Sequence, residues 1–155
     1  MTPAVVAARR AGIEHRVLEY QHDASNRSFG REAAEALGVD ARQVFKTLVA
    51  SGSGGDLIVA VIPATARLDL KALAAASSDK KVSMAEPAVA ERVTGYVVGG
   101  ISPLGQRRRL PTVLDRSALE HPCIYVSGGR RGLEIALDPR DLVTLTAARV
   151  AAIAR

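Results

Sequence analysis

The sequence predicts a mixed α/β fold of the α+β type, with helices packed around one largely β core. The chain has 155 residues, so we expect a single compact domain, residues 1–155, that buries its own core. Hydrophobic residues make up 48% of the chain and charged residues 24%, proportions that are typical of a globular protein. Helix and strand signals follow one another without the regular alternation of a doubly wound sheet, and this irregular order favours the α+β type.

Capping residues and alternating polarity predict the elements of the first half of the chain. Pro3 after Thr2 begins the first helix, glycines end the first and second helices, and Asp69 caps the third. Two β-rich runs flank residues 52–56, whose glycines are typical of a hairpin turn. In order, these signals predict a helix at 3–11, a strand at 15–20, a helix at 31–37, a short helical turn after Asp40, strands at 45–51 and 57–62, and a helix at 69–76.

Short β-rich runs separated by turn residues predict most of the second half. Pro87 begins a helix that reaches about Arg92, and Asp138-Pro139 begins the last helix. The apolar face of that last helix contains Leu142, Leu145, Thr146, Val150 and Ile153. The predicted strands lie at 81–84, 96–98, 112–115, 123–127 and 133–137.

The positive charge of the chain is concentrated in a few clusters. Lys and Arg number 21 against 16 Asp and Glu, a net charge of +5 that permits a polyanionic partner. Each cluster is compatible with a solvated surface, but their position beside glycine turns favours a shared anionic ligand. Aromatic residues make up only 3% of the chain, which argues against base stacking as a main binding mode. The clusters are Lys80-Lys81, Arg107-Arg108-Arg109 and Arg130-Arg131.

A glycine-rich segment at 95–105 directly precedes three arginines. Glycine lets the backbone approach a ligand closely, and a bared backbone can offer its N–H groups to an anion or a developing oxyanion. The spacing matches neither a Walker nor a Rossmann motif, so spacing alone favours a turn followed by a solvated basic loop.

Lys46 interrupts an apolar strand. Alternation places Phe45, Thr47 and Val49 on one side of that strand and Lys46 on the other, with Leu48. A lysine in a half-buried cleft could bind a phosphate or a carbonyl oxygen. The equally favoured alternative is a side chain that reaches water from a strand edge.

Ser127-Gly128-Gly129 ends a predicted strand with a hydroxyl and two permissive backbone positions. No Ser-His-Asp spacing accompanies it, so Ser127 is predicted to bind a ligand or shape a turn and not to act as a nucleophile. Glu134 alternates with its apolar neighbours, and it either faces solvent or contacts a ligand amine or hydroxyl.

The remaining residues exclude several classes of site. Cys123 is the only cysteine, so no internal disulfide forms, and its apolar surroundings predict a buried, inert thiol. The three histidines show no metal-ligand spacing, and we expect neither a metal nor a cofactor. Since no signal-peptide pattern or membrane-length apolar run occurs, we expect a soluble cytoplasmic protein without membrane partners.

Several motifs occur in a fixed order over nearly the whole chain and resemble the YbaK/EbsC family. This family comprises free-standing tRNA-editing deacylases related to the editing domain of bacterial prolyl-tRNA synthetases. The motifs are Val44-Phe45-Lys46-Thr47-Leu48, then Thr94-Gly95-Tyr96-Val97-Val98-Gly99-Gly100-Ile101-Ser102-Pro103-Leu104-Gly105-Gln106, and Tyr125-Val126-Ser127-Gly128-Gly129-Arg130-Arg131-Gly132-Leu133.

The resemblance implies both a fold and an activity. The fold is a mixed, partly barrel-like β-sheet surrounded by helices. The activity, by likeness to the YbaK branch, is cleavage of the ester that joins cysteine to the terminal ribose of tRNA(Pro). The cysteine thiol of the substrate would itself attack the carbonyl and leave as a cyclic thiolactone, while the protein supplies positioning and oxyanion stabilisation. A transient complex with prolyl-tRNA synthetase is also implied.

The resemblance also implies roles for individual residues. Lys46 would hold the terminal adenosine or its phosphate, and the backbone N–H groups of Gly99, Gly100 and Ile101 would lie near the scissile carbonyl. The aminoacyl pocket would contain Tyr20, Ser127, Gly128, Gly129 and Glu134. The tRNA contacts would come from Arg107, Arg108, Arg109, Arg130 and Arg131. Glu134 departs from the family pattern, which has Asp there, and its extra methylene alters the pocket.

Two other functions stay open. Relatives that clear Ala-tRNA(Pro) or another small aminoacyl group use a water nucleophile on the same scaffold. A module that binds tRNA ends or nucleotides without catalysis would show salt-sensitive binding and release no amino acid.

Overall fold

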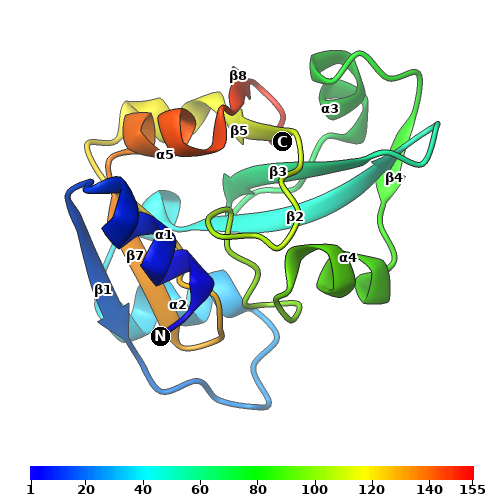
Figure 1. Cartoon of the computed structure of the whole chain (residues 1–155). Helices are drawn as coiled ribbons and strands as arrows, with labels where there is room; N and C mark the ends of the chain where they lie inside the picture. The colour runs from blue at the N-terminus through cyan, green and yellow to red at the C-terminus, as the bar shows by residue number, and fades with distance from the viewer.

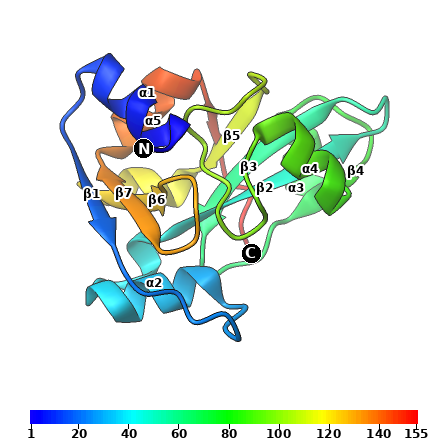
Figure 2. The same cartoon turned by 60° about the horizontal axis from the view of Figure 1, so that its bottom comes forward.

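The computed structural model describes all of residues 1–155 and contains two β-sheets with five α-helices around them (Figures 1 and 2). The fold is mixed α/β, as the sequence predicts. The helices are α1 (Pro3–Ala11), α2 (Phe29–Leu37), α3 (Leu70–Ala76), α4 (Pro87–Thr94) and α5 (Pro139–Thr146). The strands are β1 (His15–Glu19), β2 (Phe45–Gly52), β3 (Leu57–Pro63), β4 (Val82–Met84), β5 (Thr112–Asp115), β6 (Ile124–Ser127), β7 (Leu133–Leu137) and β8 (Arg149–Ala151).

The larger sheet has the strand order β4-β2-β3-β5-β8. Its centre is the predicted hairpin of β2 and β3, in which Phe45 lies opposite Pro63 and Ser51 opposite Leu57. β5 joins β3 in parallel, and β8 joins β5 in parallel. β4 pairs with β2 only at the far end of the strand, over Ala50–Gly52.

The smaller sheet has the order β1-β7-β6 and is antiparallel throughout. A single bridge between Val44 and Tyr125 connects it with the larger sheet. The strands therefore form two sheets and do not close into a barrel, which corrects the partly barrel-like sheet that the resemblance implies.

Small aliphatic residues build the core, as the low aromatic content requires. The largest cluster has 20 buried residues, and it joins α1, the inward side of β2 and β3, and the strands β6 and β7. A second cluster lies under α3 on the other side of β2 and β3, and a third lies under α2. Figure 2 shows α2 at one end of the molecule and α4 beside the β2–β3 hairpin.

The strand predicted at 96–98 is wrong. Gly95 ends α4 with a φ of 81°, and the chain then turns into a loop instead of joining a sheet. Tyr96 is buried and its hydroxyl donates to the carbonyl of Leu104 at 2.6 Å, while Val97 is 52% exposed. Tyr96 therefore anchors the loop in the core, whereas Val97 lies on the surface of the loop.

The last helix is shorter than predicted. It ends at Thr146, because Ala147 adopts a φ of 54° and the chain enters β8. Ile153 is buried, and its backbone N–H donates to Asp115 at 2.9 Å. The apolar residues beyond position 146 thus belong to a sheet edge, where pairing with β5 prevails over a helical pattern.

Two smaller observations complete the description. Cys123 lies just before β6 and is half-buried, so its thiol is less buried than predicted. No helix is long and apolar enough to cross a membrane, and no group of three or more His, Cys, Asp or Glu side chains is placed to hold a metal ion.

Candidate active site

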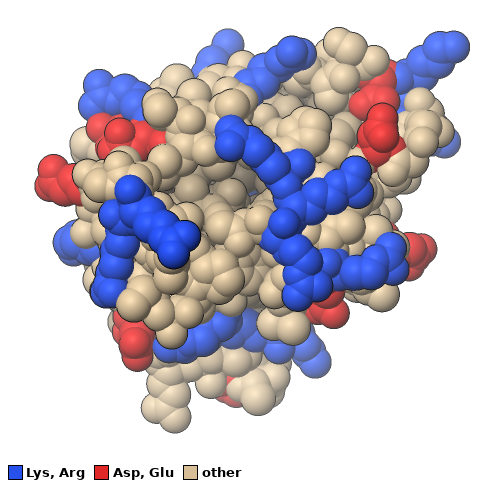
Figure 3. Space-filling view, viewed as in Figure 1, with Lys and Arg blue, Asp and Glu red and all other residues tan.

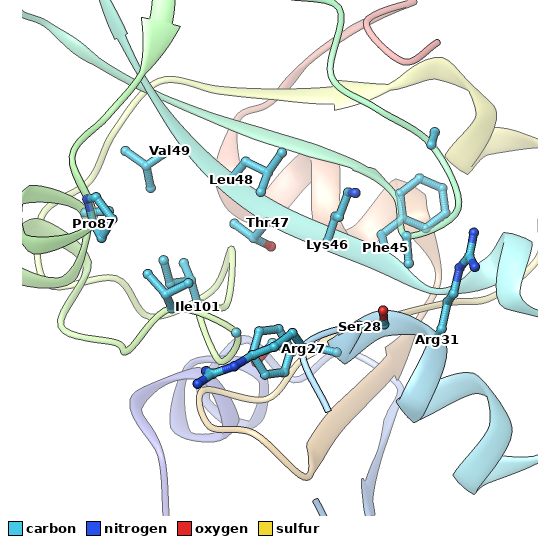
Figure 4. A pocket seen from close by; sticks show the side chains of 18 of the residues that line it. Arg27, Ser28, Arg31, Phe45, Lys46, Thr47, Leu48, Val49, Pro87 and Ile101 are labelled. Atoms are coloured by element: carbon cyan, nitrogen blue, oxygen red, sulfur yellow. The ribbon is translucent and has the colours of Figure 1, made fainter. Parts of the chain in front are cut away.

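A cavity of about 730 Å³ opens beside β2. Its size lies within the range of small-molecule sites in proteins. The first turn of α2, the start of α4, the loop at 98–101 and the loop after β3 contribute to its walls, together with residues of β6 and β7 (Figure 4). Of the residues predicted for the site, the cavity wall contains Tyr20, Lys46, Gly99, Ile101, Ser127, Arg130 and Glu134.

One wall is an unpaired edge of the larger sheet. Between the bridge at Val44 and the pairing with β4 at Ala50, β2 has a strand partner on one side only. Residues 45–49 all line the cavity there. An open strand edge carries backbone N–H and C=O groups that can hydrogen-bond a ligand.

The predicted alternation along β2 is confirmed. Phe45, Thr47 and Val49 are buried, whereas Lys46 and Leu48 are half-buried. Burial lowers the pKa of Lys46, and the positive charges of Arg31 and Arg67 lower it further. Lys46 forms no salt bridge with any carboxylate. It is therefore a partly desolvated cation without an anionic partner in the protein.

Glu134 is the acidic residue of the cavity. β7 places it opposite Ser127 of β6 and Leu18 of β1, and it is only 6% exposed. Burial raises the pKa of its carboxyl to about 8. Burial and the nearby Glu134 also raise the pKa of Tyr20 to about 12. A buried carboxyl of this kind can hold or accept a proton near neutral pH.

Burial of Glu134 is expected to make the fold less stable as the pH rises. The carboxyl keeps its proton to about pH 8 in the folded chain and loses it near its ordinary value of 4.5 in the unfolded chain. The stability that the folded state has from this carboxyl is fully present below pH 4.5 and is lost as the pH rises toward 8. Between these two pKa values, the unfolding free energy falls by up to about 1.4 kcal/mol per pH unit. Between about pH 5 and pH 8, the unfolding free energy of the wild type should fall by roughly 3 kcal/mol more than that of Glu134→Gln. Urea denaturation at each pH measures this, and equal slopes for both proteins would contradict it.

The loop at 98–101, called the glycine loop below, presents two free backbone N–H groups. The N–H of Gly100 donates to the carbonyl of Val97 at 2.8 Å and so closes a turn. The N–H groups of Gly99 and Ile101, which both line the cavity, have no acceptor within the protein. Of the three amides predicted to bind an oxyanion, Gly100 is therefore already engaged, and Gly99 and Ile101 are available.

Gly100, Gly128 and Gly129 lie behind the cavity wall and shape it by close packing. A Cβ atom on Gly100 would lie 2.8 Å from the Cα of Arg130, and one on Gly128 would lie 2.7 Å from the side chain of Leu133. The N–H of Gly129 donates to the hydroxyl of Ser127 at 3.1 Å. The two glycine motifs of the sequence thus meet, and their contact fixes the loop that carries Gly99 and Ile101.

The predicted arginines occupy different positions. Arg130 lines the cavity, whereas the Arg131 guanidinium lies 4.8 Å from the centre of the Phe29 ring and donates to the carbonyl of Val98 at 2.6 and 3.0 Å. Arg131 therefore ties the glycine loop to α2. The side chains of residues 107–109 are exposed outside the cavity, in the loop after α4. Figure 3 shows Lys and Arg side chains gathered over α4 and this loop, beside a hollow in the surface.

Sequence reasoning missed several residues of the cavity wall. The first turn of α2 contributes Phe29 and Arg31, and the loop after β3 contributes Arg67. For Thr47, the sequence pattern indicates only the side of the strand on which the residue lies. Its hydroxyl is buried and has no hydrogen-bond partner. An isolated Thr or Arg carries no sequence signal, because only the fold brings these segments together.

The comparison with known families identifies the fold around this cavity. Residues 27–145 match the model of a family described as "Aminoacyl-tRNA editing domain". The chain belongs to this editing family. A relative in Enterococcus faecalis (strain ATCC 700802 / V583) is named "Putative Cys-tRNA(Pro)/Cys-tRNA(Cys) deacylase EbsC". It is 42% identical over 142 residues, which cover 90% of this chain and 87% of the relative. The predicted resemblance to the YbaK/EbsC family is thereby confirmed.

Solved structures of similar proteins support the same membership in the editing family. One, described as "a putative trans-editing enzyme for prolyl tRNA synthetase", has a TM-score of 0.87 and 29% identity, covering 99% of this chain and 95% of that one. Another, described as hypothetical protein APE2540, has a TM-score of 0.90 and 28% identity, covering 99% and 100%. The fold is therefore shared with both of these solved structures over nearly the whole length of the chain.

Proposed function

We propose that this editing domain acts in trans as a deacylase of Cys-tRNA(Pro). The observation that carries the proposal is a cavity with a partly desolvated Lys46, a buried Glu134 and two free backbone N–H groups, at Gly99 and Ile101. No serine, histidine and acid stand together in it as a nucleophile and its base. Such a site favours a substrate that brings its own nucleophile.

The proposed step uses the cysteine of the substrate. Its sulfur forms a bond with the ester carbonyl carbon, the bond from that carbon to the ribose oxygen breaks, and the thiol proton ends on the freed ribose hydroxyl. The products are a cyclic thiolactone and uncharged tRNA. The Gly99 and Ile101 amides would stabilise the charge that develops on the carbonyl oxygen. Tyr20, Ser127 and Glu134 would surround the aminoacyl group and hold its reactive conformation.

The proposal also covers the partners of the reaction. Lys46 and neighbouring arginines would orient the tRNA end, and the exposed cluster at 107–109 would contact its backbone. A transient complex with prolyl-tRNA synthetase would bring the protein to mischarged tRNA in the cytoplasm. The name of the solved trans-editing relative supports this partner.

A panel of aminoacyl-tRNAs tests the proposed function. Purified protein is incubated with cysteinyl-, seryl- and alanyl-tRNA(Pro), with and without prolyl-tRNA synthetase, and release of the amino acid is followed. Because serine differs from cysteine by one atom and its hydroxyl is a far weaker nucleophile, we expect release from the cysteinyl substrate only. Blocking the cysteine thiol by alkylation should also stop release.

The other outcomes of the panel have defined meanings. Release of alanine or serine at the cysteine rate would overturn the thiol mechanism and indicate a water nucleophile, for which buried Glu134 is the available base. Binding of all three tRNAs without release would overturn the enzymatic function and indicate a binding module.

A further inference from the structure

The glycine loop contains a tight turn whose central peptide unit joins Val98 to Gly99. The N–H of Gly100 donates to the carbonyl of Val97 at 2.8 Å, and Gly99, the third residue of this turn, has a φ of 88°. A turn closed in this way, with a positive φ at its third residue, is a type II β-turn. Types I and II differ by a rotation of the central peptide unit of roughly 180°. Contacts from outside the turn therefore decide which way this unit faces.

Arg131 holds the carbonyl of this peptide unit. Its guanidinium donates to the Val98 oxygen from two nitrogens, at 2.6 and 3.0 Å. In a trans peptide unit the C=O and N–H groups point in opposite directions, so the Gly99 N–H points away from Arg131. Arg131 lies outside the cavity, whereas Gly99 lines it, and the Gly99 N–H has no acceptor in the protein. The contact with Arg131 therefore favours the orientation in which this N–H faces the cavity.

The other side of Val98 is held by α4. The N–H of Val98 donates to the carboxylate of Glu91 at 2.8 Å, so Val98 has an anionic acceptor on its N–H and a cationic donor on its carbonyl. Arg131 takes part in none of the salt bridges of the protein, so no carboxylate offsets its charge. Hydrogen bonds in a chain polarise one another, and a charged donor on a carbonyl makes the N–H of the same peptide unit a stronger donor. Arg131 thus strengthens the Gly99 N–H as well as orienting it.

The guanidinium of Arg131 is itself held in place by packing. It lies over the Phe29 ring, 4.8 Å from the ring centre, where a cation is attracted to the ring face. A Cβ atom on Gly99 would lie 2.8 Å from both the Arg131 Nε and the Phe29 ring, so only glycine leaves room for this contact. The His22 ring centre lies 5.7 Å from that of Phe29, and the His22 Nδ1 lies 2.7 Å from a carboxylate oxygen of the buried Glu32. The stack under the guanidinium is therefore fixed to α2.

We propose that Arg131 is a positioning residue for deacylation, which holds the Val98–Gly99 peptide unit so that the Gly99 N–H binds the oxyanion of the transition state. The proposal rests on the proposed function for the reaction that this N–H serves. It replaces the tRNA contact that the resemblance implies for Arg131, since two of its guanidinium nitrogens are already engaged. Without Arg131 the peptide unit is free to rotate to the type I arrangement. The Val98 carbonyl would then face the cavity in place of the N–H and repel an oxyanion.

Deacylation kinetics of Arg131 variants on cysteinyl-tRNA(Pro) test the proposal. Arg131→Met keeps an apolar contact with Phe29 but has no donor. It should lower kcat about 100-fold with little change in KM, because the loss of one oxyanion donor has effects of this size. Arg131→Lys keeps the charge but cannot donate from a planar fork or stack on the ring, so its kcat should recover in part, to about tenfold below the wild type.

Arg149→Met is the matched control. Arg149 also donates from its guanidinium to a backbone carbonyl, that of Ala76, but it is exposed and outside the cavity. This variant should keep the wild-type kcat and KM.

A tRNA contact by Arg131 would give a different kinetic result. KM would rise in Arg131→Met while kcat stayed unchanged, lysine would replace arginine fully, and the difference from the wild type would shrink at high salt. That result would overturn the positioning role, as would wild-type kinetics in Arg131→Met.

A crystal structure of Arg131→Met tests the geometry without substrate. The φ of Gly99 should change from positive to negative as the peptide unit rotates, and a φ that stays near 88° would overturn the proposed hold on this unit. If the wild type cleaves no aminoacyl-tRNA, the proposed function fails, while this structure still decides whether Arg131 sets the orientation of the Gly99 N–H.

Discussion

Gly100→Ala is expected to lower the rate of deacylation by at least about 100-fold, because a displacement of about 1 Å in a positioned site has effects of this size. The added methyl group would lie 2.8 Å from the Cα and 2.9 Å from the carbonyl carbon of Arg130. Backbone atoms cannot rotate away, so the two glycine motifs must separate. The N–H groups of Gly99 and Ile101 would then move away from the carbonyl that they are proposed to bind. The unfolding free energy should also fall, by about 1–3 kcal/mol, as for other overpacked sites.

A matched substitution separates this effect from a general loss of glycine. Gly54 lies in the turn between β2 and β3, has no positive φ, and would have no heavy atom within 4 Å of an added Cβ. Gly54→Ala should therefore keep wild-type activity and stability. Initial rates on cysteinyl-tRNA(Pro) and urea denaturation measure both variants. Wild-type rates for Gly100→Ala would show that the contact between the motifs does not position the reaction.

Thr47→Val is expected to stabilise the protein and weaken its activity. Valine keeps the shape of threonine but removes a buried hydroxyl that has no hydrogen-bond partner. The folded state then no longer carries an unpaired polar group, so the unfolding free energy should rise by about 1 kcal/mol. If this hydroxyl contacts the substrate, kcat/KM should fall about tenfold. Denaturation and deacylation assays on the same preparation test the expected rise in unfolding free energy and the expected fall in kcat/KM.

Thr94 supplies a control in which the buried hydroxyl has hydrogen-bond partners. Its hydroxyl is also buried, but it donates to the carbonyl of Ala90 at 2.7 Å and accepts from the N–H of Tyr96 at 3.2 Å. Thr94→Val should therefore destabilise the fold. A loss of stability in Thr47→Val, with activity unchanged, would mean that the hydroxyl serves the structure alone.

Local patterns in the sequence predict the parts of the site that depend on neighbouring residues. The alternation around Lys46 places this lysine correctly on the half-buried side of β2, and the glycines at 52–56 predict the hairpin that supports it. The strand expected at 96–98 fails because an apolar run alone does not show whether a sheet edge is available. In the structure, Tyr96 packs into the core and its neighbours turn away.

Residues whose roles depend on distant contacts could not be predicted. Arg31 and Arg67 reach one cavity because Gly30 fits against Ala64, a contact between segments that are far apart in the sequence. Arg131 shares a basic pair with Arg130, yet its guanidinium is held by Phe29 and Val98. Neither outcome follows from residue type or spacing.

The open edge of β2 has a consequence for the behaviour of the protein in solution. Unpaired strand edges on a surface invite a second chain to add a strand, which is a common route to aggregation. Here the edge is recessed behind α2, α4 and the loop at 98–101. A single flexible nucleotide end is narrower than the sheet edge of a folded neighbour, so we expect the nucleotide to reach this edge more easily. The recess that would admit a substrate thus shields the unpaired edge of β2 from other proteins. We therefore expect the protein to stay dispersed in solution while the backbone groups of this edge remain available to a ligand.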